Sequence, residues 1–195
     1  LWLPKCVDRS GWNGADSDIN PRSGIRYGAQ WSLLAKSYRF GGRDGSTIDR
    51  TEVDLDHYIP TLRRQTAALL LRYRRVGAGR DDLDVSDRYW LGGSSSIRGY
   101  RERLFPAVKA LWSTVEYRFL TDGPSRFFVF VDAGWLSDRE RRPDGSFRQT
   151  TLTRVGYGFG FRLQSRAGTL GFDYGLGKGD SPGQGKLHVR LTAGL

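Results

Sequence analysis

The sequence predicts an all-β fold, an antiparallel transmembrane β-barrel with eight strands. Three observations predict it. Apolar and polar residues alternate over long segments, which indicates strands with two different faces. Most of these segments run for about 9 to 13 residues, the length that a tilted strand needs to cross a bilayer, whereas strands of a soluble sandwich usually have about 5 or 6. The connections between them alternate between short and long, as in outer-membrane barrels.

The composition allows a barrel although its average polarity resembles that of a soluble protein. Hydrophobic residues make up 38% of the chain and the mean hydropathy is -0.52. No apolar run approaches the roughly 18 residues of a transmembrane helix, but a barrel hides its apolar residues by alternation. The chain contains no methionine, so we expect a processed form or a fragment. Cys6 is the only cysteine, so no disulfide can form within the chain.

The net charge of +10 raises nucleic acid as a partner. The basic residues, however, are spread through the alternating segments rather than gathered on one stripe. The densest run includes Arg139, Arg141 and Arg142, and acidic residues flank it, so we interpret it as a solvated loop. Because of the net charge, a soluble basic β-domain that binds nucleic acid remains an alternative to the barrel. Because the basic residues are dispersed, we expect no nucleic-acid partner.

The elements are predicted in order from the N-terminus. Residues 1–20 show no clean period, and we expect a linker or the remnant of an upstream segment. Residues 21–195 are expected to form the barrel domain. Its first strand follows Gly24, where Ile25, Tyr27, Ala29, Trp31, Leu33 and Ala35 occupy one parity. Seven further segments alternate in the same way: residues 51–59, 67–74, 111–119, 127–135, 154–164, 170–176 and 187–195.

The second face of these strands carries Arg, Asp, Glu and Gly, which is typical of a watery or hydrogen-bonded lumen. Gly156, Gly158 and Gly160 share this face. They lack the strand-to-helix context of a nucleotide-binding loop. Glycines on one parity of a strand instead leave room for something inside the barrel to approach closely.

The predicted links place the two ends of the barrel. Short links are expected at residues 60–63, 121–125 and 165–168. Long links are expected at residues 37–48, 75–107, 136–151 and 177–186. This alternation is typical of tight periplasmic turns and long external loops.

No catalytic constellation, cofactor site or metal site is predicted. His57 and His188 are the only histidines, and neither has a second histidine or a cysteine near it in sequence. Glu52, Asp54 and Asp56 share one face and could hold a cation. We expect them instead to offset lumen arginines, of which Arg26, Arg72 and Arg74 are the candidates.

The longest link contains Leu91-Gly92-Gly93-Ser94-Ser95-Ser96-Ile97-Arg98-Gly99-Tyr100. Two acids, Glu116 and Asp132, lie on inward parities of the next two strands. A carboxylate in a narrow lumen needs a partner, and a guanidinium offers bidentate hydrogen bonds. The acids could pair with Arg98 or with nearer strand arginines such as Arg118, Arg154 or Arg162, and the sequence by itself leaves both pairings open.

These motifs resemble a known family. Ile97-Arg98-Gly99-Tyr100, preceded by Leu91-Gly92-Gly93, is similar to the Val-Arg-Gly-Phe/Tyr loop motif of BamA-like and TamA-like outer-membrane assembly barrels, the bacterial surface antigen superfamily. Phe130-Val131-Asp132-Ala133-Gly134 is similar to its Phe-x-Asp-x-Gly strand motif, and Glu116-Tyr117-Arg118 to its Glu-aromatic-Arg segment. Asn20-Pro21 with Gly24 resembles its Asn-Pro-x-x-Gly motif. The resemblance covers roughly residues 16 to 195 and implies a place in the bacterial outer membrane.

The resemblance also implies a site. In the family the long loop folds into the lumen and its arginine contacts the acid of the Phe-x-Asp-x-Gly strand, so Arg98 is expected to contact Asp132, with Glu116 close by. The loop lock would comprise Gly92, Gly93, Ile97, Arg98, Gly99 and Tyr100. Its lumen partners would be Glu116, Phe130, Asp132 and Gly134.

Family members insert β-barrel proteins into the outer membrane or move polypeptides across it, usually through a weak seam between first and last strands. The implied partners are outer-membrane lipid and client outer-membrane or secreted polypeptides. The eight predicted strands match the C-terminal half of a sixteen-stranded family barrel, and no periplasmic POTRA domain is present in the sequence. We therefore expect part of a larger barrel, a small barrel, or a half that self-associates to complete a larger one. A structural barrel that anchors a separate passenger domain is the functional alternative.

Overall fold

The computed structural model describes residues 2–36, 46–78, 83–121, 125–165 and 168–193. Within these ranges nine strands form one antiparallel sheet in the order β1-β2-β3-β4-β7-β8-β9-β10-β11, which confirms the predicted all-β fold. The sheet strands are β1 (Trp2–Asn13), β2 (Gly24–Lys36), β3 (Ser46–Pro60), β4 (Gln65–Ala78), β7 (Lys109–Leu120), β8 (Arg126–Arg141), β9 (Phe147–Ser165), β10 (Gly168–Gly177) and β11 (Lys186–Ala193).

The predicted faces are present. The parity expected to meet lipid is exposed, as for Val129 at 51% and Val189 at 58%. The opposite parity is buried where the chain covers it, as for Phe128 at 2% and Asp132 at 0%. The first face is named the outer face and the second the inner face.

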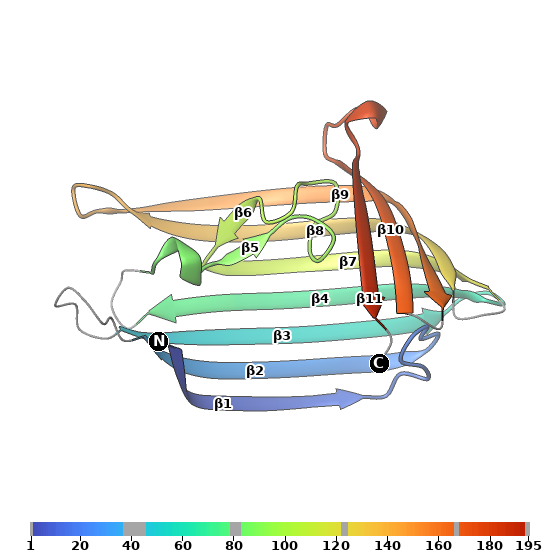
Figure 1. The fold of residues 1–195 in the computed structure, drawn as a ribbon, viewed down its shortest axis with the longest axis horizontal. Helices are drawn as coiled ribbons and strands as arrows, with labels where there is room; N and C mark the ends of the chain where they lie inside the picture. Colours follow the sequence, from blue (N-terminus) through green and yellow to red (C-terminus); the bar gives the residue numbers. More distant parts are fainter. Residues whose placement is uncertain (1, 37–45, 79–82, 122–124, 166–167, 194–195) are drawn as a thin grey trace.

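The sheet is curved and open. In Figure 1, β10 and β11 turn away from the direction of the other strands and cross in front of them. The terminal strands β1 and β11 each pair with one neighbour only among the described residues. Two short strands, β5 (Tyr89–Leu91) and β6 (Phe105–Ala107), form a separate hairpin beside β7 and β8 (Figure 1).

Residues 1–20 were expected to be a linker or the remnant of an upstream segment, and most of them are not a linker. Trp2–Asn13 form β1, which pairs with β2 along its length. The alternation is missing because Asp8 and Ser10 oppose Trp31 and Ala29 and so share the outer face with them. The irregular register between Pro4 and Cys6 breaks the pattern further. The sheet therefore has one strand more than the eight that the sequence predicts.

The link expected at residues 136–151 is also mostly strand. Strand β8 continues to Arg141 and β9 begins at Phe147, with the two paired in register up to these residues. Beyond the bilayer a strand no longer needs apolar residues on its outer face, so the alternation stops before the strand does. Residues 37–45, 122–124 and 166–167, which fall in other predicted links, and residues 194–195, in the last predicted strand, lie outside the described residues.

Two short 3-10 helices, η1 (Val85–Asp87) and η2 (Pro182–Gln184), lie in the long links. No helix in the described ranges is long and apolar enough to span a membrane. The described residues also hold no cluster of His, Cys, Asp and Glu that could bind a metal ion.

Candidate functional site

The segment between β5 and β6, residues 92–104, lies against the inner face and is named the inward loop. Its backbone needs glycine: Gly92, Gly93 and Gly99 have φ values of 109°, 87° and 91°, in the left-handed region that side chains disfavour. The Gly93 amide donates to the Ile97 carbonyl at 3.1 Å. The Gly92 amide donates to Ser96 Oγ at 2.8 Å. These bonds close a tight turn that presents the residue after Ile97 to the sheet.

Arg98 occupies that position and is 5% exposed. Its Nε donates to Asp132 Oδ2 and its Nη2 to Asp132 Oδ1, both at 2.8 Å. Its backbone amide also donates to Asp132 Oδ2, at 2.9 Å. A bidentate pair of this kind fixes both the distance and the orientation of the guanidinium. Asp132, on β8, thus binds both the side chain and the main-chain amide of Arg98.

Glu116, on β7, takes the remaining part of the guanidinium. Arg98 Nη1 donates to Glu116 Oε1 at 2.9 Å. The second oxygen of Glu116 accepts from Arg118 Nε at 2.9 Å. Both acid pairings left open by the sequence are therefore present for Glu116, because it lies between the two arginines. Asp132 also accepts a hydrogen bond from the Thr114 hydroxyl, whose oxygen lies 2.7 Å from Oδ1.

A second buried pair borders this network. Asp173 of β10 is 1% exposed and accepts two hydrogen bonds from Arg162 of β9, at 2.7 and 2.8 Å. Its Oδ1 lies 3.9 Å from Arg98 Nη1. Burial by itself lowers the pKa of Arg98, but the hydrogen bonds with Asp132 and the charges of Glu116 and Asp132 outweigh it, so the pKa lies above its ordinary value.

Aromatic rings cover the guanidinium. Arg98 Cζ lies 3.5 Å from the ring centroid of Phe130 and 5.7 Å from that of Phe128. Both rings come from the inner parity of β8 and are 2–3% exposed. A cation over an aromatic face gains attraction when water is excluded. The site therefore binds Arg98 by charge, by hydrogen bonds and by ring contact.

Glycines on the inner face make the close approach possible. A Cβ on Gly156 would lie 1.7 Å from the carbonyl oxygen of Arg98, and one on Gly175 would lie 2.5 Å from the amide nitrogen of Gly99. A Cβ on Gly134 would lie 2.4 Å from Ile97 Cδ1. Since any side chain at these positions would clash, the main chain of the inward loop rests directly on β9 and β10, and the Ile97 side chain rests on β8.

Apolar packing surrounds the charged contacts. Ile97 is fully buried and joins a cluster with the hairpin and with β7 and β8. Tyr100 donates its hydroxyl to the Val155 carbonyl at 3.1 Å and packs edge-on against Phe105 at 5.2 Å between ring centroids. The buried members of the cluster are Leu91, Ile97, Phe105, Ala107, Ala110 and Leu136.

The structure places the predicted residues in three groups. Glu116, Phe130 and Asp132 each contact Arg98. Ile97, Gly99, Tyr100 and Gly134 form the packing around them. Gly92 and Gly93 shape the turn, where a Cβ would meet Arg101 and Glu102 respectively.

The sequence did not single out Thr114, Phe128 or Gly175, nor did it place Asp173 beside Arg98. Each lies on the inner parity of its strand, and parity was the signal that could have found them.

The acids of β3 neutralise arginines of β4, as expected. Arg72 pairs with Asp54 at 3.3 Å and with Asp56 at 2.5 Å. Arg74 pairs with Asp54 at 2.6 Å and with Glu52 at 3.5 Å. The ion pair that the structure shows for Arg26 is instead with Asp18, at 3.3 Å.

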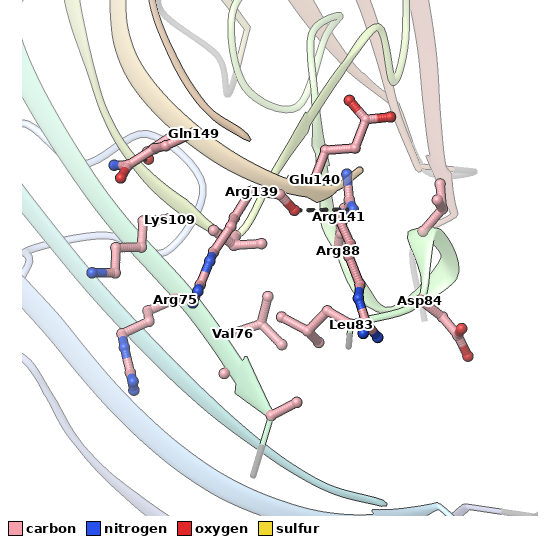
Figure 2. Close-up of a pocket in the computed structure, with 15 residues that line it drawn as sticks. Arg75, Val76, Leu83, Asp84, Arg88, Lys109, Arg139, Glu140, Arg141 and Gln149 are labelled. Atoms are coloured by element: carbon pink, nitrogen blue, oxygen red, sulfur yellow. Dashed lines mark hydrogen bonds between the residues drawn. The ribbon is translucent and has the colours of Figure 1, made fainter. Parts of the chain in front are cut away.

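A cavity lies away from this network, at the end of the sheet where the long links gather. It holds about 650 Å³ and is bordered by the C-terminal ends of β4 and β8, the start of β7 and the segment around η1. Figure 2 shows that its wall is rich in charged side chains, among them Arg75, Arg88, Lys109 and Arg139.

Comparisons with known proteins agree with this architecture. The family model of the Omp85 superfamily domain matches residues 9–195. The crystal structure of BamA from Haemophilus ducreyi lacking POTRA domains 1-3 superposes with a TM-score of 0.70 at 16% sequence identity. The match covers 93% of this chain but 40% of the BamA chain, so the chain spans less than half of that protein. No curated protein matches the sequence.

Proposed function

The chain belongs to the Omp85 superfamily of bacterial outer-membrane proteins, which are not enzymes, and we propose that it forms part of a barrel that assembles or translocates client polypeptides. The superfamily and the fold support an outer-membrane location. The exposed apolar outer face agrees with contact with lipid and argues against a soluble domain that binds nucleic acid. Residues 21–195 together with β1 would form one domain of the surface antigen type.

One observation carries the functional proposal: the main chain and side chain of Arg98 are both bound by Asp132 inside the sheet. We infer that the inward loop acts as a lock that holds β7, β8, β9 and β10 in one arrangement. That arrangement would keep this wall of the barrel rigid while a client pairs with a free strand edge elsewhere.

The test replaces the two members of the lock separately. Arg98→Ala leaves Asp132 buried without its guanidinium partner and removes one of the two arginines that contact Glu116, and breaking a buried pair in this way costs about 3–5 kcal/mol. Asp132→Ala in turn leaves Arg98 buried without the carboxylate that binds its Nε and Nη2. We expect both variants to lose resistance to SDS at room temperature, seen as loss of the heat-modifiable band. Normal heat-modifiable folding in both would contradict the lock.

A matched control is Arg154→Ala. Arg154 lies on β9 with its guanidinium 5.2 Å from the ring centroid of Phe105, beside the inward loop. It donates to the carbonyl of Thr153 at 3.0 Å, and the described residues show no ion pair for it. We expect this variant to fold as the wild type does.

A second assay separates the two candidate functions. Vesicles that contain the protein are given an unfolded β-barrel client, and its insertion is measured. Faster client insertion than in empty vesicles supports the assembly function. No acceleration by a protein that is folded and heat-modifiable would instead favour the structural anchor.

A further inference from the structure

Three cationic side chains come together on the outer face at the long-link end of the sheet. Arg75 of β4 lies directly opposite Lys109 of β7 in the strand register. Lys109 in turn lies opposite Ser137 of β8, and Arg139 follows two residues later on the same face. Arg75, Lys109 and Arg139 are named the rim cluster.

The rim cluster faces outward. Leu111 and Trp135 share its parity on β7 and β8, and they are 39% and 41% exposed. Lys109 and Arg139 are exposed, and the Arg75 side chain is 41% exposed. Figure 2 shows the three side chains side by side at one wall of the 650 Å³ cavity, with Glu140 and Asp84 on the other side.

The cavity exists because the strands end at different heights. Strand β7 begins at Lys109, whereas its neighbours β4 and β8 continue to Ala78 and Arg141. Above Lys109 the two neighbours are therefore without a common partner strand, apart from the hydrogen bonds that Val108 makes to Val76 and Ser137. This leaves a notch beside the rim cluster that is large enough for a phosphate group.

The neighbouring outward-facing residues indicate the depth of the rim cluster in the membrane. On the side nearer the middle of the sheet, the next outward positions on the three strands are Tyr73, Leu111 and Trp135, which lie opposite one another. They are about 7 Å from the rim cluster along the strands. Tyr and Trp concentrate where the apolar band of a barrel meets water. The rim cluster therefore lies just outside the hydrocarbon, at the level of the lipid head groups.

The charge of the site favours an anion. Arg75 pairs with Asp49 at 2.5 Å, and Lys109 and Arg139 bring two further positive charges to this part of the outer face. Arg and Lys at head-group depth attract anionic lipids, and guanidinium groups bind phosphate through two parallel hydrogen bonds.

We propose that the rim cluster binds the phosphate groups of lipopolysaccharide in the outer leaflet. The choice of leaflet rests on the proposed function, since the long links of an outer-membrane barrel face outward from the cell. Lipopolysaccharide is the phosphorylated lipid of that leaflet, and its acyl chains would lie along the apolar outer face below Trp135. The lipid would thereby be anchored beside the wall of the barrel that carries the inward loop.

The test measures binding of lipid A to the detergent-solubilised full chain by native mass spectrometry. The probes are bisphosphorylated lipid A and the same lipid with both phosphates removed. Lys109→Gln combined with Arg139→Gln removes two of the three cations, and we expect at least a tenfold loss of affinity for the phosphorylated lipid. The dephosphorylated lipid is expected to bind weakly to both proteins.

The control is Arg22→Gln combined with Arg63→Gln, which removes the same charge from exposed positions at the short-link end. We expect this control to bind lipid A as the wild type does. Equal binding by the rim variant, or equal binding of the two lipids, would overturn the proposal. Full displacement of lipid A by inorganic phosphate at equal concentration would also overturn it, because the site would then take the free anion.

The outcome also separates this inference from the proposed function. Heat-modifiable folding of the wild type and both variants shows that the barrel has formed. If folding is normal and the rim variant still binds lipid A, the lipid site fails and the barrel function stands. If the wild type does not fold into membranes at all, both fail.

Discussion

At the scale of single residues, the burial of Arg98 depends on the absence of side chains at two neighbouring glycines as much as on its acidic partners. Two carboxylates, Asp132 and Glu116, neutralise a guanidinium that would otherwise be costly to bury. The same contacts require the loop main chain to lie almost on the strands, and glycine at Gly156 and Gly175 provides the space. The two carboxylates therefore bind the arginine, and the glycines leave the space that the loop main chain needs.

Gly156→Ala tests the second of these requirements. Its Cβ would meet the Arg98 carbonyl oxygen at 1.7 Å, so the loop must move away, at a cost of about 1–3 kcal/mol. In the wild type Arg98 is 5% exposed and should resist trypsin. We expect the variant to be cut after Arg98, as measured by mass spectrometry of a brief digest.

Gly28→Ala is the matched control for this experiment. Gly28 lies in β2, and a Cβ there would have no atom within 4 Å. Its digest should equal that of the wild type. Protection of Arg98 in the Gly156 variant would show that the loop tolerates displacement from β9.

At the scale of elements, the inward loop and its hairpin pack on the inner face of the sheet and form a buried core with it. A single curved sheet with a lipid-facing side buries residues only on its inner face. Here the hairpin β5–β6 and the loop supply the partners for that face, and Ile97 is 0% exposed at their centre. The long link is thus a structural layer rather than a mere connection.

Ile97→Ala should therefore destabilise the protein although no charge is touched. Truncating a fully buried isoleucine costs about 2–5 kcal/mol through lost transfer energy and the cavity left behind. We expect a lower midpoint of urea unfolding in lipid vesicles, followed by tryptophan fluorescence. Val129→Ala, on the outer face at 51% exposure, should shift the midpoint much less, and equal shifts would show that the loop adds no core.

Elements also show what a sequence can predict and where it fails. Alternation predicted eight sheet strands because lipid demands apolar residues at every second position. It missed β1, where Asp8 and Ser10 occupy the outer parity, and it missed the ends of β8 and β9, which extend beyond the apolar band. The pairing of Arg98 with Asp132 came from the family motif, since parity alone could not rank Arg98 above Arg118 or Arg162. Thr114 and Asp173 carry no motif. Parity places both on the inner face, but their closeness to Arg98 and Asp132 depends on where the inward loop lies.

At the scale of the whole molecule, the sheet presents two free edges. Strand β1 pairs only with β2, and β11 only with β10, within the described ranges. Unpaired backbone groups cost several kcal/mol each in hydrocarbon, so only closed barrels cross a bilayer as sheets. We therefore expect these two edges to be paired in the membrane, by further strands of the same protein or by a second copy.

We expect the 195-residue chain, produced by itself, to complete the barrel with a second copy through pairing of β1 with the partner's β11. The measurement is the mass of the protein part of the detergent-solubilised particle, found by light scattering with the detergent contribution subtracted. Two copies would give twice 22.0 kDa. A folded, heat-modifiable particle of 22.0 kDa would contradict the expectation, because β1 and β11 of one chain would then have to close on each other around the inward loop. Cysteines placed on β1 and on β11 separate the cases further, since in a two-copy barrel they should crosslink only between chains.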